Sequence, residues 1–85
     1  MVNEIENRVK NVMSIVFNIP TNHIIEKTSP DNLEEWDSLK HLNLVIALEE
    51  EFAITFSDND IENILSFDLI RRIVEKNIRL NKWVK

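Results

Sequence analysis

The fold follows from the stretch DSLKHLNLVIALEEEF, residues 37–52, in which apolar residues recur at the spacing of an α-helix. At about 100° of rotation per residue, a helix from Ser38 to Glu51 separates its apolar side chains into two stripes. The first stripe is Leu44, Val45, Leu48 and Phe52, and the second, which begins beside Ser38, is Leu39, Leu42 and Ile46. One stripe is enough for packing on neighbouring helices. The second is therefore either a docking surface or another buried face, and periodicity alone leaves both possibilities open.

Three further helices are predicted around this one. Apolar residues at three- and four-residue steps indicate a first helix from Asn3 to Phe17, which Pro20 ends. After the central helix, the motif SDND at residues 57–60 supplies caps for a short helix through Ile64. Ser66 caps a last helix, whose predicted apolar face is Leu69, Ile70, Ile73, Val74, Asn77 and Ile78.

Periodicity fails between the first two helices, from Thr21 to Trp36, where turn-forming residues are frequent and the apolar anchors are Ile24, Ile25 and Leu33. Long loops are uncommon in small domains unless they are functional. We therefore expect one all-α domain over residues 1–85. It is a small four-helix bundle with three longer helices, a short third helix and a long loop between the first two.

Composition removes several classes of function. The chain has 85 residues, no glycine and no cysteine. Without glycine, the phosphate-binding loops of P-loop and dinucleotide-binding proteins cannot be built. Without cysteine, disulfides and thiolate metal sites are excluded, and any thioester chemistry needs a thiol from a prosthetic group. A bundle of this size also leaves little room for a deep active site that excludes water.

Charge is distributed unevenly along the chain. Residues 26–62 hold eleven acidic side chains and two lysines, whereas residues 63–85 hold six basic and two acidic side chains. The acidic centre argues against nucleic acid and for basic protein partners. The N-terminal residues show neither a signal peptide nor a membrane span, so we expect a cytoplasmic protein. No long heptad repeat is present, and we expect a monomer.

Asp37 and Ser38 at the start of the central helix are, taken alone, ordinary capping residues. Their combination with four helices, the long loop, EEEF at residues 49–52 and SDND at residues 57–60 resembles acyl carrier proteins, and the resemblance extends from Ile5 to Ile78. It implies that Ser38 carries a 4′-phosphopantetheine arm, delivered from coenzyme A by a phosphopantetheinyl transferase with Mg²⁺. The arm would hold acyl or aminoacyl groups as thioesters, and the carrier itself would catalyse nothing. Asp37 matches the acidic residue that precedes the modified serine.

The resemblance also implies where partners bind. Acyl-loading and acyl-processing enzymes would dock on the central helix through Leu39, Leu42, Ile46, Glu49 and Glu50. The acyl chain would be sheltered among the helices near Leu44, Leu48 and Ile64. A phosphodiester on Ser38 would lie at the positive end of the helix dipole, which favours an exposed anion by about 0.3–1 kcal/mol.

Three features depart from the family pattern. Trp36 stands where the family commonly has glycine, so it either braces the loop or touches the arm. Lys40 and Asn43 stand where fatty-acid carriers usually have acidic residues, and the last helix is basic. These departures favour a discrete carrier for polyketide, nonribosomal peptide or related synthesis over one for fatty acid synthesis.

Two other functions compete with the carrier interpretation. Ser38 and His41 are three residues apart, so a small hydrolase with Asp37 as third member is conceivable, but the chain lacks the usual elements of an oxyanion hole. The expected role of His41 is that of an exposed helix residue. The other alternative is an unmodified helical interaction module. His23 and Glu26 do not form a recognisable ligand set, and no bound metal is expected.

Overall fold

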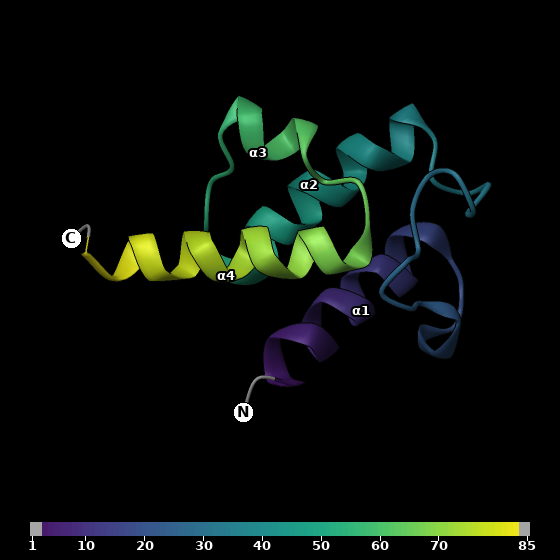
Figure 1. Cartoon of the computed structure of the whole chain (residues 1–85), viewed down its shortest axis with the longest axis horizontal. Coiled ribbons are helices and arrows are strands. Elements are labelled where there is room, and N and C mark those ends of the chain that lie inside the picture. The colour runs from purple at the N-terminus through teal and green to yellow at the C-terminus, as the bar shows by residue number, and fades with distance from the viewer. Residues whose placement is uncertain (1–2, 84–85) are drawn as a thin grey trace.

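Four α-helices and one 3₁₀ turn make up the regular structure of the described part of the chain. The computed structural model describes the backbone of residues 3–83 and the side chains of residues 4–79. The elements are α1 (Asn3–Phe17), η1 (Thr21–His23), α2 (Ser38–Phe52), α3 (Asp58–Glu62) and α4 (Phe67–Trp83). Helix α1 packs against α2 and α4, and Figure 1 shows the short α3 at the edge opposite to the N-terminus. The predicted all-α arrangement with a short third helix is confirmed.

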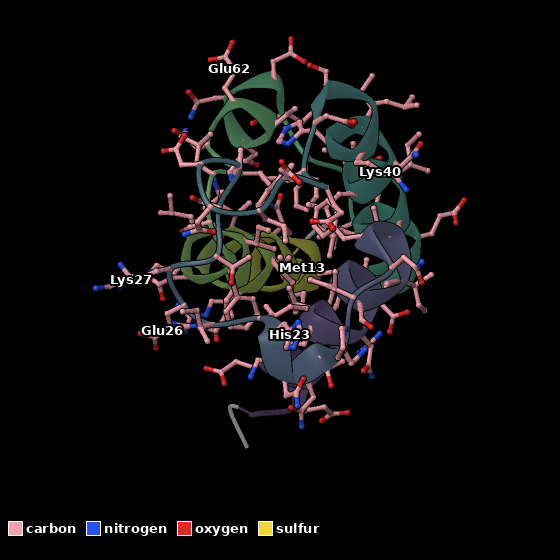
Figure 2. The ribbon with its side chains drawn as sticks, turned by 90° about the vertical axis from the view of Figure 1, so that its right-hand side faces the viewer. Met13, His23, Glu26, Lys27, Lys40 and Glu62 are labelled. Atoms are coloured by element: carbon pink, nitrogen blue, oxygen red, sulfur yellow. The ribbon has the colours of Figure 1, made fainter. Side chains whose placement is uncertain are left out.

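The apolar stripes of the three longer helices meet in one core. Met13 lies at the centre of the molecule in Figure 2, while Glu26, Lys27 and Glu62 point outwards. Buried residues of the core include Val9, Val12, Met13 and Phe17 from α1, Leu44, Val45, Leu48 and Phe52 from α2, and Phe67, Ile70, Ile73 and Val74 from α4. The first stripe predicted for the central helix is therefore confirmed as its buried face.

Two of the predicted apolar positions are wrong. Leu69 was assigned to the buried face of the last helix, but it is exposed, and Phe67 at the start of α4 is buried instead. In the loop, Ile24 is buried whereas its neighbour Ile25 is exposed. Ile25 lies in the loop after η1, where helical periodicity gives no direction. Leu69 is the third residue of α4, so periodicity gives the direction of its side chain but not whether a neighbouring element covers it.

Helices α1 and α2 end in left-handed backbone conformations without the help of glycine. Asn18 has φ 59° and Ala53 has φ 55°. Asparagine tolerates this conformation well, whereas for alanine it is unfavourable by about 1–2 kcal/mol. The backbone N–H of Ala53 donates to the Glu49 carbonyl, so one of the last carbonyls of α2 is satisfied there.

The long loop between α1 and α2 is fastened to the start of α4. The backbone N–H of Phe67 donates to the Thr28 carbonyl at 3.0 Å, and that of Asp68 donates to the Glu26 carbonyl at 3.3 Å. Thr28 is itself buried, and its hydroxyl accepts the N–H of Ile25. These contacts order the loop and bring its end, Trp36, against the core.

A buried carboxylate joins α3 to α4. Asp60 pairs with Ser57 in a capping box, receives the ammonium of Lys76 at 2.6 Å and the side-chain amide of Asn77 at 3.2 Å. Burial alone would raise the pKa of Asp60, but the hydrogen bonds from Lys76, Asn77 and the Ser57 backbone outweigh burial and leave its pKa below the ordinary value of 3.8. One charge of the basic last helix is thus used inside the fold.

Replacing Lys76 should weaken this junction in a pH-dependent way. We expect Lys76→Met to lower the free energy of unfolding at pH 7 by about 1 kcal/mol, because hydrogen bonds to charged groups contribute about 1.5–3 kcal/mol and solvent weakens a pair whose lysine is half exposed. The pKa of Asp60 is lower in the folded than in the unfolded chain. The contribution of the Asp60 carboxylate to the free energy of unfolding is therefore fully present above pH 3.8. It is lost as the pH falls through the lower pKa of the folded state.

Urea unfolding of the native chain and the variant, from pH 7 down to below 3.8, measures this difference, and the two stabilities should converge in acid. Lys27→Met is the matched control, since it removes the same charge from an exposed loop position. An equal loss of stability in both variants would contradict the role given to Lys76.

Candidate functional site

Ser38 lies in the first turn of α2 with an exposed side chain, and Asp37 precedes it as the N-cap residue. The Asp37 carboxylate accepts the backbone N–H of Lys40 at 2.9 Å, and the Asp37 carbonyl accepts the N–H of His41 at 2.8 Å. Asp37 therefore does the capping. The Ser38 hydroxyl makes no hydrogen bond to any residue in the described part of the chain, so it is available for chemistry.

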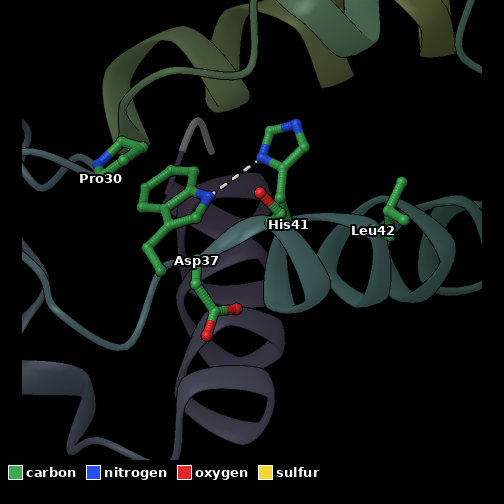
Figure 3. Close-up of a pocket in the computed structure, with 6 residues that line it drawn as sticks. Pro30, Asp37, His41 and Leu42 are labelled. Carbon is green, nitrogen blue, oxygen red and sulfur yellow. Dashed lines mark hydrogen bonds between the residues drawn. The ribbon is translucent and has the colours of Figure 1, made fainter.

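A groove of about 560 Å³ opens to solvent beside Ser38. Its lining comes from the loop and the first two turns of α2, namely Pro30, Trp36, Asp37, Ser38, His41 and Leu42. Figure 3 shows Pro30 and His41 on the same side of the start of α2, with the Asp37 carboxylate pointing away from them. The serine hydroxyl thus stands at the edge of a hollow that is largely apolar.

Trp36 braces the end of the loop against two helices. Its side chain is 4% exposed, and its ring lies 5.2 Å, between ring centroids, from that of Phe17 in α1. Its indole N–H donates to Nδ1 of His41 in α2 at 3.0 Å, the hydrogen bond drawn as a dashed line in Figure 3. Of the two roles considered for Trp36, bracing is the one that these contacts support directly.

His41 is not the exposed helix residue that the sequence predicted. Its ring is half-buried and has a partner on each nitrogen, because Nε2 lies 3.3 Å from the carbonyl oxygen of Ile61 in α3. An indole N–H can only donate, so Nδ1 must accept, and the proton of the neutral ring sits on Nε2, which donates to Ile61. With both nitrogens engaged in this way, His41 does not pair with Ser38, and the hydrolase arrangement is not formed.

The contact between Trp36 and His41 could have been found in the sequence. Trp36 immediately precedes the N-cap residue, and His41 is the fourth residue of the helix. In many helices these two positions pack together as a hydrophobic staple. The signal for this contact is the distance of the two residues from the N-cap, and it does not depend on the chemistry of the imidazole or on the second stripe.

The second apolar stripe of α2 is exposed. Leu39, Leu42 and Ile46 have exposed fractions of 66%, 57% and 55%. The alternative of a helix buried on two sides is therefore wrong. An apolar row of this exposure on one helix is the kind of surface that marks a protein interaction site.

The acidic residues near the stripe differ in their availability. The Glu49 carboxylate accepts the backbone N–H of Phe56 at 2.8 Å, which fastens the segment after α2 to the helix. Glu51 forms an ion pair with Arg8 at 2.8 Å. Glu50 is exposed, and its side chain has no hydrogen-bond or ion-pair partner within the described residues. Of the two acidic residues predicted for docking, Glu50 is thus the more accessible.

Lys40 is directed towards α1 and not towards the stripe. Its ammonium donates to the carbonyl oxygen of Val16 at 3.0 Å, near the C-terminal end of α1, where a positive charge suits the helix dipole. Asn43 is exposed on α2. The contact with Val16 therefore accounts for Lys40, one of the two residues that stand where fatty-acid carriers usually have acidic residues.

The other candidate features are placed as follows. Leu44, Leu48 and Ile64, the residues predicted to shelter a cargo, are all fully buried in the core. Within the described residues, no group of three or more histidine, aspartate or glutamate side chains could hold a metal ion. No helix in that part of the chain is long and apolar enough to cross a membrane.

Comparison with known proteins gives two informative matches. No protein-family model matches the sequence. The chain is 38% identical over 64 residues to the acyl carrier protein of Buchnera aphidicola subsp. Schizaphis graminum (strain Sg), and this alignment covers 74% of the chain and 80% of that protein. Its fold is similar to the solution NMR structure of a holo acyl carrier protein from Geobacter metallireducens, with a TM-score of 0.83, 21% identity and coverage of 94% and 92% of the two chains.

The fold and the sequence match together define a small helical carrier protein. The chain belongs to the acyl carrier protein family, a family of non-catalytic carriers whose prosthetic group is 4′-phosphopantetheine. The hydrolase alternative is excluded by this membership, in agreement with the engagement of both nitrogens of His41.

The capping role of Asp37 leads to a prediction about stability. We expect Asp37→Ala to lower the free energy of unfolding by about 1 kcal/mol, because the N–H of Lys40 loses its partner. Asp37→Asn should stay within a few tenths of a kcal/mol of the native chain, since asparagine caps about as well as aspartate. Urea unfolding of the three proteins measures both differences. Equal stability of the alanine variant and the native chain would show that this cap is dispensable.

Proposed function

We propose that this chain is a discrete acyl carrier and that the Ser38 hydroxyl is the point at which 4′-phosphopantetheine is attached. The observation that supports this best is the exposed hydroxyl in the first turn of α2, beside an N-cap that Asp37 already satisfies. The family membership supports the prosthetic group, and the Asp37-Ser38 pair at the start of α2 supports Ser38 as its point of attachment. A phosphopantetheinyl transferase would deliver the group from coenzyme A with Mg²⁺.

The surroundings of Ser38 fit a phosphodiester. The backbone N–H groups of Ser38 and Leu39 have no hydrogen-bond partner within the described residues, as expected of the first residues of a helix. These N–H groups and the positive end of the α2 dipole favour an anion at this place. The Asp37 carboxylate is turned to the N–H of Lys40, which offsets part of its repulsion of a nearby phosphate.

The thiol at the end of the arm supplies the chemistry of the carrier, because it holds acyl or aminoacyl groups as thioesters. The residues beside Ser38 have the following roles in this proposal. Asp37 caps α2 and is recognised by the transferase. Trp36 keeps the loop beside Ser38 in place through Phe17 and His41, and its ring forms part of the groove that the arm passes.

We further propose that partner enzymes dock on the exposed stripe, Leu39, Leu42 and Ile46, with Glu50 as the main acidic contact. Glu49 contributes less, because one of its oxygens already accepts the Phe56 N–H. Since Lys40 and Asn43 provide no negative charge here, apolar contact outweighs electrostatic attraction at this surface. That balance supports a specialised pathway, such as polyketide or nonribosomal peptide synthesis, ahead of fatty acid synthesis.

We propose that residues 1–85 form one carrier domain that acts as a monomer in the cytoplasm, has no membrane span and binds no nucleic acid. The acidic centre of the chain supports basic protein partners for it.

Intact-protein mass spectrometry tests the attachment site. After incubation with coenzyme A, Mg²⁺ and a broad-specificity phosphopantetheinyl transferase, we expect the native chain to gain the mass of one phosphopantetheine and Ser38→Ala to gain none. A folded native chain that gains no mass, with a transferase shown to be active on a known carrier, would overturn the proposal. The unmodified interaction module would then be the better interpretation.

The docking surface is tested by the kinetics of the same modification. We expect Ile46→Asp to lower kcat/KM of the transferase by about five-fold or more, because the residues whose loss costs over about 1 kcal/mol cluster near the centre of an interface. Ile15→Asp is the matched control, since Ile15 is 80% exposed on α1 and lies outside the stripe. An equal decrease for both variants would show that the stripe has no particular part in docking.

A further inference from the structure

A single imidazole connects three segments of the chain next to Ser38. His41 lies on α2, accepts the indole N–H of Trp36 from the loop at 3.0 Å, and reaches the carbonyl of Ile61 in α3 at 3.3 Å. The indole and imidazole rings are also stacked, with centroids 6.2 Å apart and planes inclined by 22°. The ring of His41 therefore spans the gap between α2 and α3 at the end of the bundle where Ser38 is found.

The position of His41 on α2 makes it the first residue of the buried face. His41, Leu44 and Leu48 follow one another at three- and four-residue steps, so their side chains line one side of the helix. Leu44, Leu48 and Ile64 are fully buried behind it. A long group attached to Ser38 that entered the core between α2 and α3 would have to displace the His41 ring.

Displacing His41 would leave the Trp36 indole N–H without a partner. The Trp36 side chain is 4% exposed, so its N–H would lose its acceptor where little water can replace it. The carbonyl of Ile61 would lose the imidazole donor and keep the backbone N–H of Ile64 at 3.3 Å. No such loss is needed to occupy the groove beside Ser38, which is already open and is bordered by Pro30, Trp36 and Leu42.

We infer that Trp36 and His41 close the bundle interior to the cargo of this carrier, and that the cargo lies in the surface groove between Pro30, Trp36 and Leu42. This inference rests on the proposed attachment at Ser38. A long alkyl chain in an open groove keeps much of its apolar surface in water, which is unfavourable. The chemical class that suits this site is therefore a short or polar acyl or aminoacyl group.

The test compares the protein that carries an acetyl-phosphopantetheine or an octanoyl-phosphopantetheine arm on Ser38. The transferase moves each arm from the corresponding acyl-coenzyme A and releases the adenosine bisphosphate part. Methyl NMR resonances of Leu44, Leu48 and Ile64 report on the interior, while the Leu42 methyls and the Trp36 indole N–H report on the groove. Relative to the acetyl form, we expect the octanoyl group to shift the resonances of Leu42 and Trp36. The resonances of the interior methyls should be the same in the two forms. Shifts of the interior methyls in the octanoyl form of the native chain would overturn the inference.

Variants of His41 test the barrier itself. In His41→Ala, octanoyl loading should now shift the interior methyls. In His41→Gln it should again leave them unchanged, because the glutamine oxygen can accept the Trp36 N–H and its amide can donate to Ile61. Interior methyls that do not respond in His41→Ala would show that His41 is not the barrier.

If His41→Ala does not fold, as judged from the NMR spectrum of its unloaded form, Trp36→Phe replaces it. This variant keeps a ring against Phe17, but it removes the indole N–H and part of the ring surface that stacks on His41, so it releases His41 from the loop. The interior methyls should then respond to octanoyl, and unchanged interior resonances would overturn the inference. Intact mass is recorded before each spectrum. A native chain that cannot be loaded at all contradicts the proposed attachment at Ser38, and this failure is seen separately from any NMR result.

Discussion

The hydrogen bond from the Trp36 indole to His41 is the contact on which the geometry around Ser38 depends. It joins the end of a long loop to the first turns of α2, and the contact of the Trp36 ring with Phe17 carries the connection on to α1. In its first turn, α2 is also fastened by Lys40 to the end of α1, and in its last turn by Glu49 to the segment that leads to α3. Polar contacts hold α2 at both ends, and apolar contacts hold it along its length. Its outer face therefore keeps its position although no neighbouring element covers it.

The distribution of charge along the sequence overstates the charge that a partner meets. Of the three glutamates that end α2, Glu49 and Glu51 are engaged within the fold, and on α4 the same holds for Lys76 and for Arg71, which contacts Glu6 and Asp68. Hydrogen bonding to Asp68, the largest influence, raises the pKa of Arg71. The other acidic residues of the segment 26–62 are mostly exposed and keep their charge, and their attraction for a basic partner is screened over about 10 Å at moderate salt.

The sequence predicted the helices well because three of them have strongly periodic apolar faces, and α1 has the bounds that were expected. It could not decide whether Leu39, Leu42 and Ile46 are buried, because periodicity gives the direction of a side chain on its own helix but not what lies opposite. The same limit explains Leu69 on α4, whereas Ile25 lies in the loop after η1, where there is no helical periodicity to give its direction. His41 is a different case: the spacing of Trp36 and His41 about the N-cap predicts their contact, but the approach of the Ile61 carbonyl depends on the position of α3, which the sequence pattern does not give. The attachment at Ser38 and the docking residues remain predictions.

The absence of glycine has a consequence for the unfolded chain. Where many helices end on glycine, α1 and α2 here end on Asn18 and Ala53 in the left-handed region, at a cost in backbone energy. In return, an unfolded chain without glycine has fewer conformations to lose, and a glycine-to-alanine change at a position that tolerates it is worth about 0.4–1 kcal/mol through this effect alone. A protein with so small a core gains from every such restriction. The unfavourable backbone energy at the two helix ends is thus offset by the smaller conformational entropy of the whole unfolded chain.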